Sequence, residues 1–419
     1  MNARILLTLF FMLLLCADLF GQITLDECQQ RARENYPLVK QFQLISQSTN
    51  LSLENASRNY WPQTSLFSAI SYQSAVTSLP IEIPGLNVPT LSKDQYQVNL
   101  EASQLIWDGG KVDAQKKQIR ISGELEQKQL EADLYQIKSR INELYFGILL
   151  FEEQLANNLL LQEELNRNLR RVKEYLKFGI ATERDVQELS VMLLEIKQQE
   201  DKFISSRNAY LDMLEKFIGI PLPQGISMPN SIPPPQNNSF FRRPEFISLN
   251  TSELKLDVER KLADAKILPV INLFARIGYG RPGLDLLKDD FSFYYVGGIR
   301  LTWNISALYT FQNDKKMIET ARRNLIIAKS VFQFNEDLKL MRLKREWLNQ
   351  MELLRKDDEI IELRSSICRS SESKLKNGVI DVTDLLKDLT DENMARRNKS
   401  YHQIQLLYTL YQMKYVTNE

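Results

Sequence analysis

The chain has 419 residues, of which 43% are hydrophobic and 25% are charged, as is usual for a folded protein. Basic and acidic residues are balanced at 53 each, which argues against a nucleic-acid-binding protein, since such proteins show a basic excess. The length allows two or three ordinary domains or one large repeated unit. The 15 glycines and 14 prolines are clustered, so long segments are free of both and can form helix.

The N-terminal segment reads MNARILLTLFFMLLLCADLFGQ. Arg4 precedes an uncharged, mostly apolar run from Ile5 to Leu15, which is typical of a secretory signal and too short to span a membrane. We therefore expect residues 1–22 to be a signal peptide, with lipidation at Cys16 as the alternative. No later segment is apolar for long enough to predict a membrane-spanning helix.

Cysteine and histidine are scarce. Beyond the signal only Cys28 and Cys368 remain, and we interpret them as two unpaired small hydrophobes rather than as a disulfide framework. His402 is the only histidine, so neither a zinc site nor a Ser-His-Asp triad is predicted, and it is expected on a helix face. The stretch GYGRPG at Gly278–Gly283 matches the dinucleotide pattern G-x-G-x-x-G, but no helix is predicted after it, so we expect a loop at a strand end. The sequence thus predicts no enzyme and no cofactor.

The chain contains an internal repeat. The stretch WPQTSLFSAISY from Trp61 aligns with LPVINLFARIGY from Leu268, sharing the Pro, Leu-Phe, Ile and Tyr positions. Each copy is expected to contain a helix, two strands, a very long helix and a shorter helix. The predicted parts are a first structural repeat at 23–222, a Pro/Asn-rich connector at 223–240 and a second structural repeat at 241–419.

Period-two alternation of apolar and polar residues predicts four strands, at 63–76, 96–106, 271–279 and 291–303. Such strands fit either a soluble sheet packed on a core or the wall of a transmembrane β-barrel. The export signal favours the barrel, and so do Trp61, Trp107 and Trp303, which fall at the strand ends next to the helices. Four strands cannot close a barrel, and lipid does not tolerate unpaired edges, so several chains would have to share one.

The helices expected after the strands lie at 111–178, 182–217, 313–376 and 381–416. The two longer ones would each measure roughly 100 Å. Apolar residues at spacings of three and four predict a coiled-coil seam in the first: Leu144, Ile148, Phe151, Leu155 and Leu159. Helices this long should run as antiparallel hairpins that reverse at two similar stretches, KFGIATERD at Lys177 and KNGVIDVTD at Lys376.

These features together resemble the TolC-type outer-membrane efflux channels. The resemblance is carried by TLDECQQRARENYP, by LIWDGGKVDAQKKQ, by the tandem repeat and by the two x-G-x-x-x-x-x-D turns. It implies a mainly α protein with a β-barrel part, in which a long antiparallel coiled-coil α-barrel continues a transmembrane β-barrel shared by a trimer with four strands per chain. It also implies a location in the bacterial outer membrane, extending into the periplasm. The implied partners are two further copies of the chain, outer-membrane lipid, a periplasmic adaptor (membrane fusion) protein and an inner-membrane pump, but no nucleic acid.

The resemblance also suggests a pore constriction. Asp384 matches a ring of aspartates that narrows the pore in relatives, and Asp185 is its counterpart in the first repeat, where stabilising a helix N-terminus is the alternative. A second gate aspartate would fall on Lys387, with Asp388 beside it. Such a ring favours cations, and conductance should depend on pH because crowded like charges resist ionisation. The Tyr and Arg that latch some relatives closed correspond to Leu375 and Ile380, so the latch does not carry over.

Two further sets of residues are candidates. The hairpin tips are expected to contact the adaptor through Gly179, Ile180, Ala181, Gly378, Val379 and Ile380. The stretch WDGG is interpreted as a strand-to-helix bend at Asp108, Gly109 and Gly110, in which Asp108 caps the helix and the glycines permit the turn; a recognition role is the alternative.

We therefore expect a passive channel that serves as the exit duct of a tripartite efflux or secretion system. The alternative is a periplasmic adaptor or structural coiled-coil protein without a pore. Adaptors usually have one helical hairpin and a soluble β domain, whereas this chain predicts two hairpins and strands suited to lipid.

Overall fold

A computed structural model describes residues 23–77, 90–222, 226–229, 233–235 and 240–418. The expected signal peptide with Cys16, much of the segment that precedes the second strand, and part of the connector lie outside these residues. The chain forms two units. The helical unit contains residues 23–41, 129–247 and 330–418, and the sheet unit contains residues 42–128 and 248–329.

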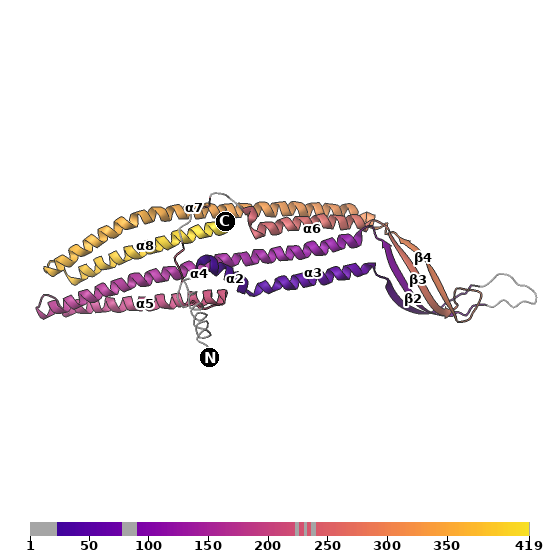
Figure 1. The fold of residues 1–419 in the computed structure, drawn as a ribbon, viewed down its shortest axis with the longest axis horizontal. Coiled ribbons are helices and arrows are strands. Elements are labelled where there is room, and N and C mark those ends of the chain that lie inside the picture. Colours follow the sequence, from indigo (N-terminus) through magenta and orange to yellow (C-terminus); the bar gives the residue numbers. More distant parts are fainter. Residues whose placement is uncertain (1–22, 78–89, 223–225, 230–232, 236–239, 419) are drawn as a thin grey trace, which may run out of the picture. The chain divides into compact units, whose positions relative to one another are not determined.

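On both sides of the connector the chain forms a helix, two strands, a long helix and a shorter helix in this order, and the first side begins with one additional helix (Figure 1). The first set is α2 (Leu25–Asn35), η1 (Pro37–Lys40), α3 (Gln41–Ser57), η2 (Arg58–Tyr60), β1 (Gln63–Tyr72), β2 (Asp94–Trp107), α4 (Lys111–Lys177) and α5 (Glu183–Ile218). The second is η3 (Phe240–Arg242), α6 (Pro244–Lys266), β3 (Val270–Arg281), β4 (Ser292–Thr302), α7 (Ala307–Lys376) and α8 (Val382–Thr417). Helices α4 and α7, of 67 and 70 residues, are each about 100 Å long at the usual rise per residue.

Most predicted boundaries are correct to within two residues, with two exceptions. Strand β1 ends at Tyr72 rather than at 76, because Gln73 makes the last backbone bond to Lys93 and the chain then bends. Helix α7 begins at Ala307 rather than at 313, because the amides of residues 307–309 bond to the carbonyls of residues 304–306 and the turn runs directly into the helix.

The sheet unit contains one antiparallel sheet with strand order β1-β2-β3-β4. Its register aligns Leu66, Leu100, Ile277 and Tyr295 in one row across the four strands, so the apolar sides of all strands share one face. That face is exposed: its large side chains include Leu66, Ile70, Val98, Leu100, Leu273, Ile277, Phe293, Tyr295, Ile299 and Leu301. Glu101, Arg276 and Arg300 lie on the opposite, polar face.

The sheet is flanked by paired helices within the same unit. Helices α6 and α7 are joined by ion pairs, from Arg322 to Asp257 and from Lys329 to Glu253. Helix α4 approaches α3 at Gly123, where a Cβ atom would lie only 2.2 Å from the Thr49 hydroxyl oxygen. The absence of a side chain at Gly123 therefore permits this close packing.

The helical unit has a buried centre of apolar and ionic residues near the start of α6 and the end of α8. Tyr135, Phe240, Leu340, Leu343, Leu410, Met413, Tyr415 and Val416 form a buried cluster. Arg243 is buried beside it, pairs with Glu245 and Glu336, and lies 5.1 Å from the Tyr415 ring. The Tyr135 hydroxyl donates to the Tyr415 carbonyl at 2.6 Å. One guanidinium thus links α6, α7 and the last turns of α8.

The predicted seam of α4 holds only in part. Leu144 and Ile148 are buried, but Leu159 is exposed, which corrects the prediction for that position. Buried Asn158 donates to the Ile196 carbonyl of α5 at 3.1 Å, and Gln162 donates to Glu200, also of α5, at 2.6 Å. Polar bonds therefore replace an apolar contact in this part of the α4–α5 hairpin. Within the described ranges, no helix is both long and apolar enough to cross a lipid bilayer.

Replacing Arg243 by alanine should lower the free energy of unfolding by about 3 kcal/mol, because it leaves the partly buried carboxylates of Glu245 and Glu336 uncompensated. The matched control is Arg355→Ala, whose exposed side chain pairs with Glu352 one helical turn away and should contribute less than about 1 kcal/mol. Denaturant unfolding followed by circular dichroism measures both. Equal losses in the two variants would contradict the central role of Arg243.

Candidate functional site

Both hairpin tips reverse the chain with the same backbone motif. At the end of α4, the Ile180 amide donates to the Tyr175 carbonyl at 2.9 Å and the Gly179 amide to Leu176 at 3.1 Å. At the end of α7, the Val379 amide donates to the Lys374 carbonyl at 2.9 Å and the Gly378 amide to Leu375 at 3.0 Å. These bonds define a Schellman motif in each tip. The glycines have φ of 71° and 70°, a left-handed conformation that disfavours other residues.

The three aspartates predicted for the constriction have different surroundings. Asp185 belongs to a capping box: its carboxylate accepts from the Thr182 amide and hydroxyl, both at 2.8 Å. Asp388 accepts from the Ser371 hydroxyl of α7 at 2.6 Å. Asp384 is exposed in the first turn of α8, and within the described part of the chain its carboxylate has no hydrogen bond or ion pair. Asp384 is therefore the one of the three whose carboxylate is not engaged by another residue of the described chain.

The tip residues predicted to contact an adaptor also divide into two groups. Ile180 and Val379 are largely exposed, at 59% and 68% of their surface, whereas Ala181 and Ile380 pack against the core between the hairpins. Phe178 was not predicted, yet it is a large exposed aromatic side chain next to Gly179. Leu375, at a latch position of relatives, is buried in the core. Both positions that correspond to the latch thus contribute apolar packing.

A core near the tips joins the two hairpins. It contains residues from α4, α5, α7 and α8: Leu161, Leu165, Val172, Leu189, Cys368, Leu375, Val382, Leu385 and Leu389. The Thr383 hydroxyl of α8 also donates to Glu188 of α5 at 2.8 Å. That bond, together with one from Arg184, holds the pKa of the Glu188 carboxyl below its usual range. Sequence analysis missed this link, because Thr383 and Glu188 are distant in the chain.

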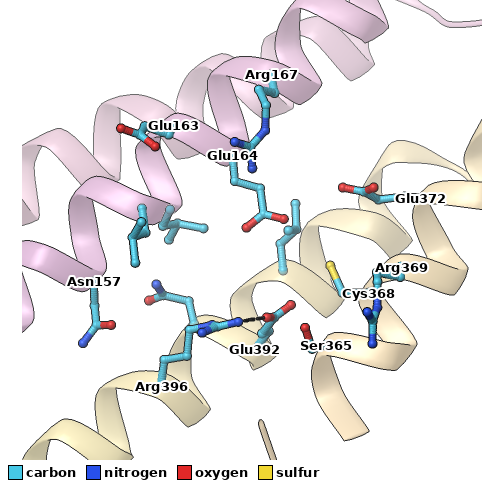
Figure 2. A pocket seen from close by; sticks show the side chains of 14 residues that line it. Asn157, Glu163, Glu164, Arg167, Ser365, Cys368, Arg369, Glu372, Glu392 and Arg396 are labelled. Carbon is cyan, nitrogen blue, oxygen red and sulfur yellow. Dashed lines mark hydrogen bonds and ion pairs between the residues drawn. The ribbon is translucent and has the colours of Figure 1, made fainter. Parts of the chain in front are cut away.

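Beside this core lies a cavity of about 340 Å³ between α4, α7 and α8 (Figure 2). Its wall combines carboxylates and guanidiniums with the Cys368 thiol, and the Glu164 side chain extends from α4 toward α7 and α8. Burial, then the nearby charges of Glu392 and Glu372, raise the pKa of Glu164. Burial also raises the pKa of Cys368 to about 12, so this thiol stays protonated and unreactive.

The strand-to-helix bend has the geometry of a helix cap. Asp108 is buried, and its two carboxylate oxygens accept from the amides of Gly110 at 2.9 Å and Val112 at 2.7 Å. Gly109 and Gly110 both have positive φ, and a Cβ atom on Gly109 would clash with Leu268 at 2.6 Å. These contacts give Asp108 and both glycines a structural role at the start of α4.

The remaining candidates show no catalytic arrangement. Cys28 and Cys368 are buried and unpaired, which confirms that interpretation. His402 of α8 lies with Nδ1 2.7 Å from a carboxylate oxygen of buried Asp357 on α7. The stretch GYGRPG ends β3 and is followed by a loop, as predicted. Among the described residues, no three histidine, cysteine or acidic side chains gather as ligands for a metal ion.

Solved structures with two such helical hairpins and a four-stranded sheet are outer-membrane channels. The solved structures with this fold include the transmembrane channel CusC, at 12% identity and a TM-score of 0.72 over 95% of this chain and 92% of that chain. VceC of Vibrio cholerae is 12% identical, and the match covers 94% of this chain and 96% of that chain with a TM-score of 0.68. The MtrE channel of Neisseria gonorrhoeae, solved in its open state, is 15% identical, and the match covers 95% of this chain and 89% of that chain with a TM-score of 0.68.

No protein-family model matches the chain, and no curated protein matches its sequence. The likeness to the solved channels therefore establishes the fold. At the level of the fold, this likeness confirms the resemblance to TolC-type channels that the sequence suggested.

Acidification should remove the destabilising effect that ionised Glu164 has on the contact between the two hairpins. Because the pKa of Glu164 is raised in the folded state, its ionised form destabilises the fold; this cost is absent below the ordinary pKa and complete above the raised one. Glu164→Gln should therefore increase the free energy of unfolding near pH 8 and have little effect near pH 4. Urea titrations at several pH values measure this difference.

The control for this experiment is Glu163→Gln, which changes the exposed neighbouring carboxylate of the same cavity. It should show no comparable dependence on pH. Parallel pH profiles for the two variants would rule out a special role for Glu164.

Proposed function

We propose that this protein is the outer-membrane exit duct of a tripartite efflux or secretion system. Three copies would form one channel, in which each chain contributes four strands to a transmembrane β-barrel and its hairpins to an α-helical tunnel in the periplasm. The channel would be a passive conduit, with no enzymatic activity. The internal two-fold repeat would supply the two hairpins of each chain, which is consistent with the sequence of helix, two strands, long helix and shorter helix on both sides of the connector.

The exposed apolar face of the sheet carries this proposal. Ile70, Phe293 and Tyr295 each expose 80% or more of their surface, although they lie side by side with other large apolar residues. Lipid would cover such a face, and each large side chain would gain about 1.5–3 kcal/mol on leaving water. Trp61, Trp107 and Trp303 are exposed at the helix-side ends of the strands, where the boundary of a membrane would favour tryptophan.

The edges of the sheet support the trimer. Strands β1 and β4 are the two edges, and each has one side without a partner strand in the described chain. A lipid environment requires every backbone donor and acceptor to be paired. Joining β4 of one copy to β1 of the next would satisfy these groups and generate a closed ring.

The tips support the proposed partners. The exposed apolar side chains of Ile180 and Val379 would contact a periplasmic adaptor protein, which in turn would connect the channel to an inner-membrane pump. Asp384, whose carboxylate has no hydrogen bond or ion pair within the described chain, would form a ring of three carboxylates in the pore. Such a ring would favour cations.

Single-channel recording in planar bilayers tests the pore. The purified protein should conduct with a preference for cations, and Asp384→Ala should lower the ratio of potassium to chloride permeability by on the order of twofold. Asp185→Asn is the matched control: its parent carboxylate caps a helix, so the substitution should leave selectivity unchanged. Absence of conductance in all three proteins would contradict the channel.

Carbonate extraction distinguishes the channel from the alternative, a periplasmic adaptor or structural coiled-coil protein without a pore. An embedded barrel should remain in washed membranes, and its mass in detergent should correspond to three chains. Release into the carbonate supernatant would favour the adaptor, whose signal sequence is cleaved and whose β domain is soluble.

A further inference from the structure

The polar face of the sheet carries an unbalanced charge. The register places Glu101, Arg276 and Arg300 on this face, and the other residues that the four described strands direct to it are uncharged, such as Gln97, Asn99 and Ser103. One carboxylate and two guanidiniums leave one positive charge per chain. The two arginines come from β3 and β4, on the far side of β2 from the edge strand β1.

The single carboxylate is already saturated. One oxygen of Glu101 accepts from Arg300 Nη1 at 2.9 Å, and the other accepts from Arg276 Nε at 2.9 Å and Nη2 at 2.5 Å. The Glu101 side chain is only 12% exposed, whereas Arg276 and Arg300 are 35% and 43% exposed. The surplus positive charge is therefore accessible, while the carboxylate beneath it is not.

Aromatic rings hold both guanidiniums in place. Arg300 lies 4.3 Å from the centre of the Phe274 ring, and Arg276 lies 5.2 Å from that of Phe67. The Phe274 ring in turn covers Gly298, where an added Cβ atom would be 3.3 Å away. Stacking fixes the plane of a guanidinium and leaves its remaining N–H donors in a fork that matches a carboxylate or phosphate group.

A hydrogen bond between Tyr294 and Asn99 lies on the same polar face of the sheet. The Tyr294 hydroxyl donates to Asn99 at 2.8 Å, and its ring crosses Gly278, which has no side chain to displace it. The glycines of β3 and β4 thus allow rings to lie flat on the sheet, and the charged groups stand beside them rather than beneath bulky side chains.

We infer that this part of the polar face is an anion-binding station for solutes that carry carboxylate or phosphate groups. The inference rests on the proposed function, in which the polar face lines the lumen of the barrel. Three chains would then place six arginines and three glutamates at one level, a net charge of plus three, which attracts anions in a confined channel. This positive charge is opposite to the negative charge of the proposed Asp384 ring, so the barrel would favour anions and the ring would favour cations.

Bilayer recording in an Asp384→Ala background tests the station, because the tip then no longer contributes its carboxylates. The ratio of chloride to potassium permeability should exceed one in this parent protein. Arg300→Gln should lower the ratio by on the order of twofold, since it cancels the surplus charge, and Glu101→Gln should raise it by a similar factor. Inorganic tripolyphosphate added on the outer side should block the parent and not the Arg300→Gln variant.

Two controls accompany these variants. Arg300→Lys keeps the charge and should keep the permeability ratio of the parent. Arg322→Gln removes a guanidinium that pairs with Asp257 between α7 and α6, and it should also leave the ratio unchanged. If Glu101→Gln does not fold, the comparison of Arg300→Gln with Arg300→Lys decides the question by itself.

The outcomes separate this inference from the proposed function. A conducting pore whose selectivity and block are the same in the parent and in Arg300→Gln would overturn the anion-binding station and leave the channel intact. Absence of conductance in every variant would contradict the channel and, with it, the station.

Discussion

The antiparallel pairing of each long helix with a shorter one is the constraint on which the rest of the structure depends. An isolated helix of 67 or 70 residues exposes its apolar stripe along its whole length, so α4 and α7 need partners. The tight reversal that provides the partner requires a left-handed residue, and Gly179 and Gly378 supply it at equivalent positions. The hairpins then meet in a core to which all four helices contribute.

The sheet differs from the helices in that its apolar residues are exposed rather than packed in a core. Among the described residues of its unit, no core covers its apolar face, and its two outer strands have free edges. A soluble protein would bury such a face or interrupt it with charges. Instead, the charges are on the opposite side, where the two arginines are fixed by one glutamate and by aromatic rings. The separation of apolar and charged residues onto opposite faces is consistent with the proposed barrel, whose wall would have one face toward lipid and one toward water.

Carboxylates of the same residue type acquire different roles through their surroundings. Asp108 and Asp185 both accept backbone hydrogen bonds at helix starts, and Asp388 joins two helices through Ser371. Asp384 occupies the same helical position as Asp185, but its carboxylate is not part of a cap. The N-cap residues differ: the Thr182 hydroxyl accepts from the Asp185 amide and donates to its carboxylate, whereas the Asp381 carboxylate has no proton to donate and carries the same charge as Asp384.

Local patterns in the sequence were enough to predict the order of helices and strands, the two hairpin turns and the bend at Asp108. Each of these depends on residues close together in the chain: alternation along a strand, a glycine after a long helix, an aspartate before one. The tertiary structure decided which groups distant in sequence meet. It brought Thr383 to Glu188, Glu101 to two arginines, and Arg243 to three helices. On α4 it buried Asn158, which bonds to α5, and left the neighbouring Leu159 of the predicted seam exposed. No periodicity encodes such contacts, because they arise only when separate elements pack against one another.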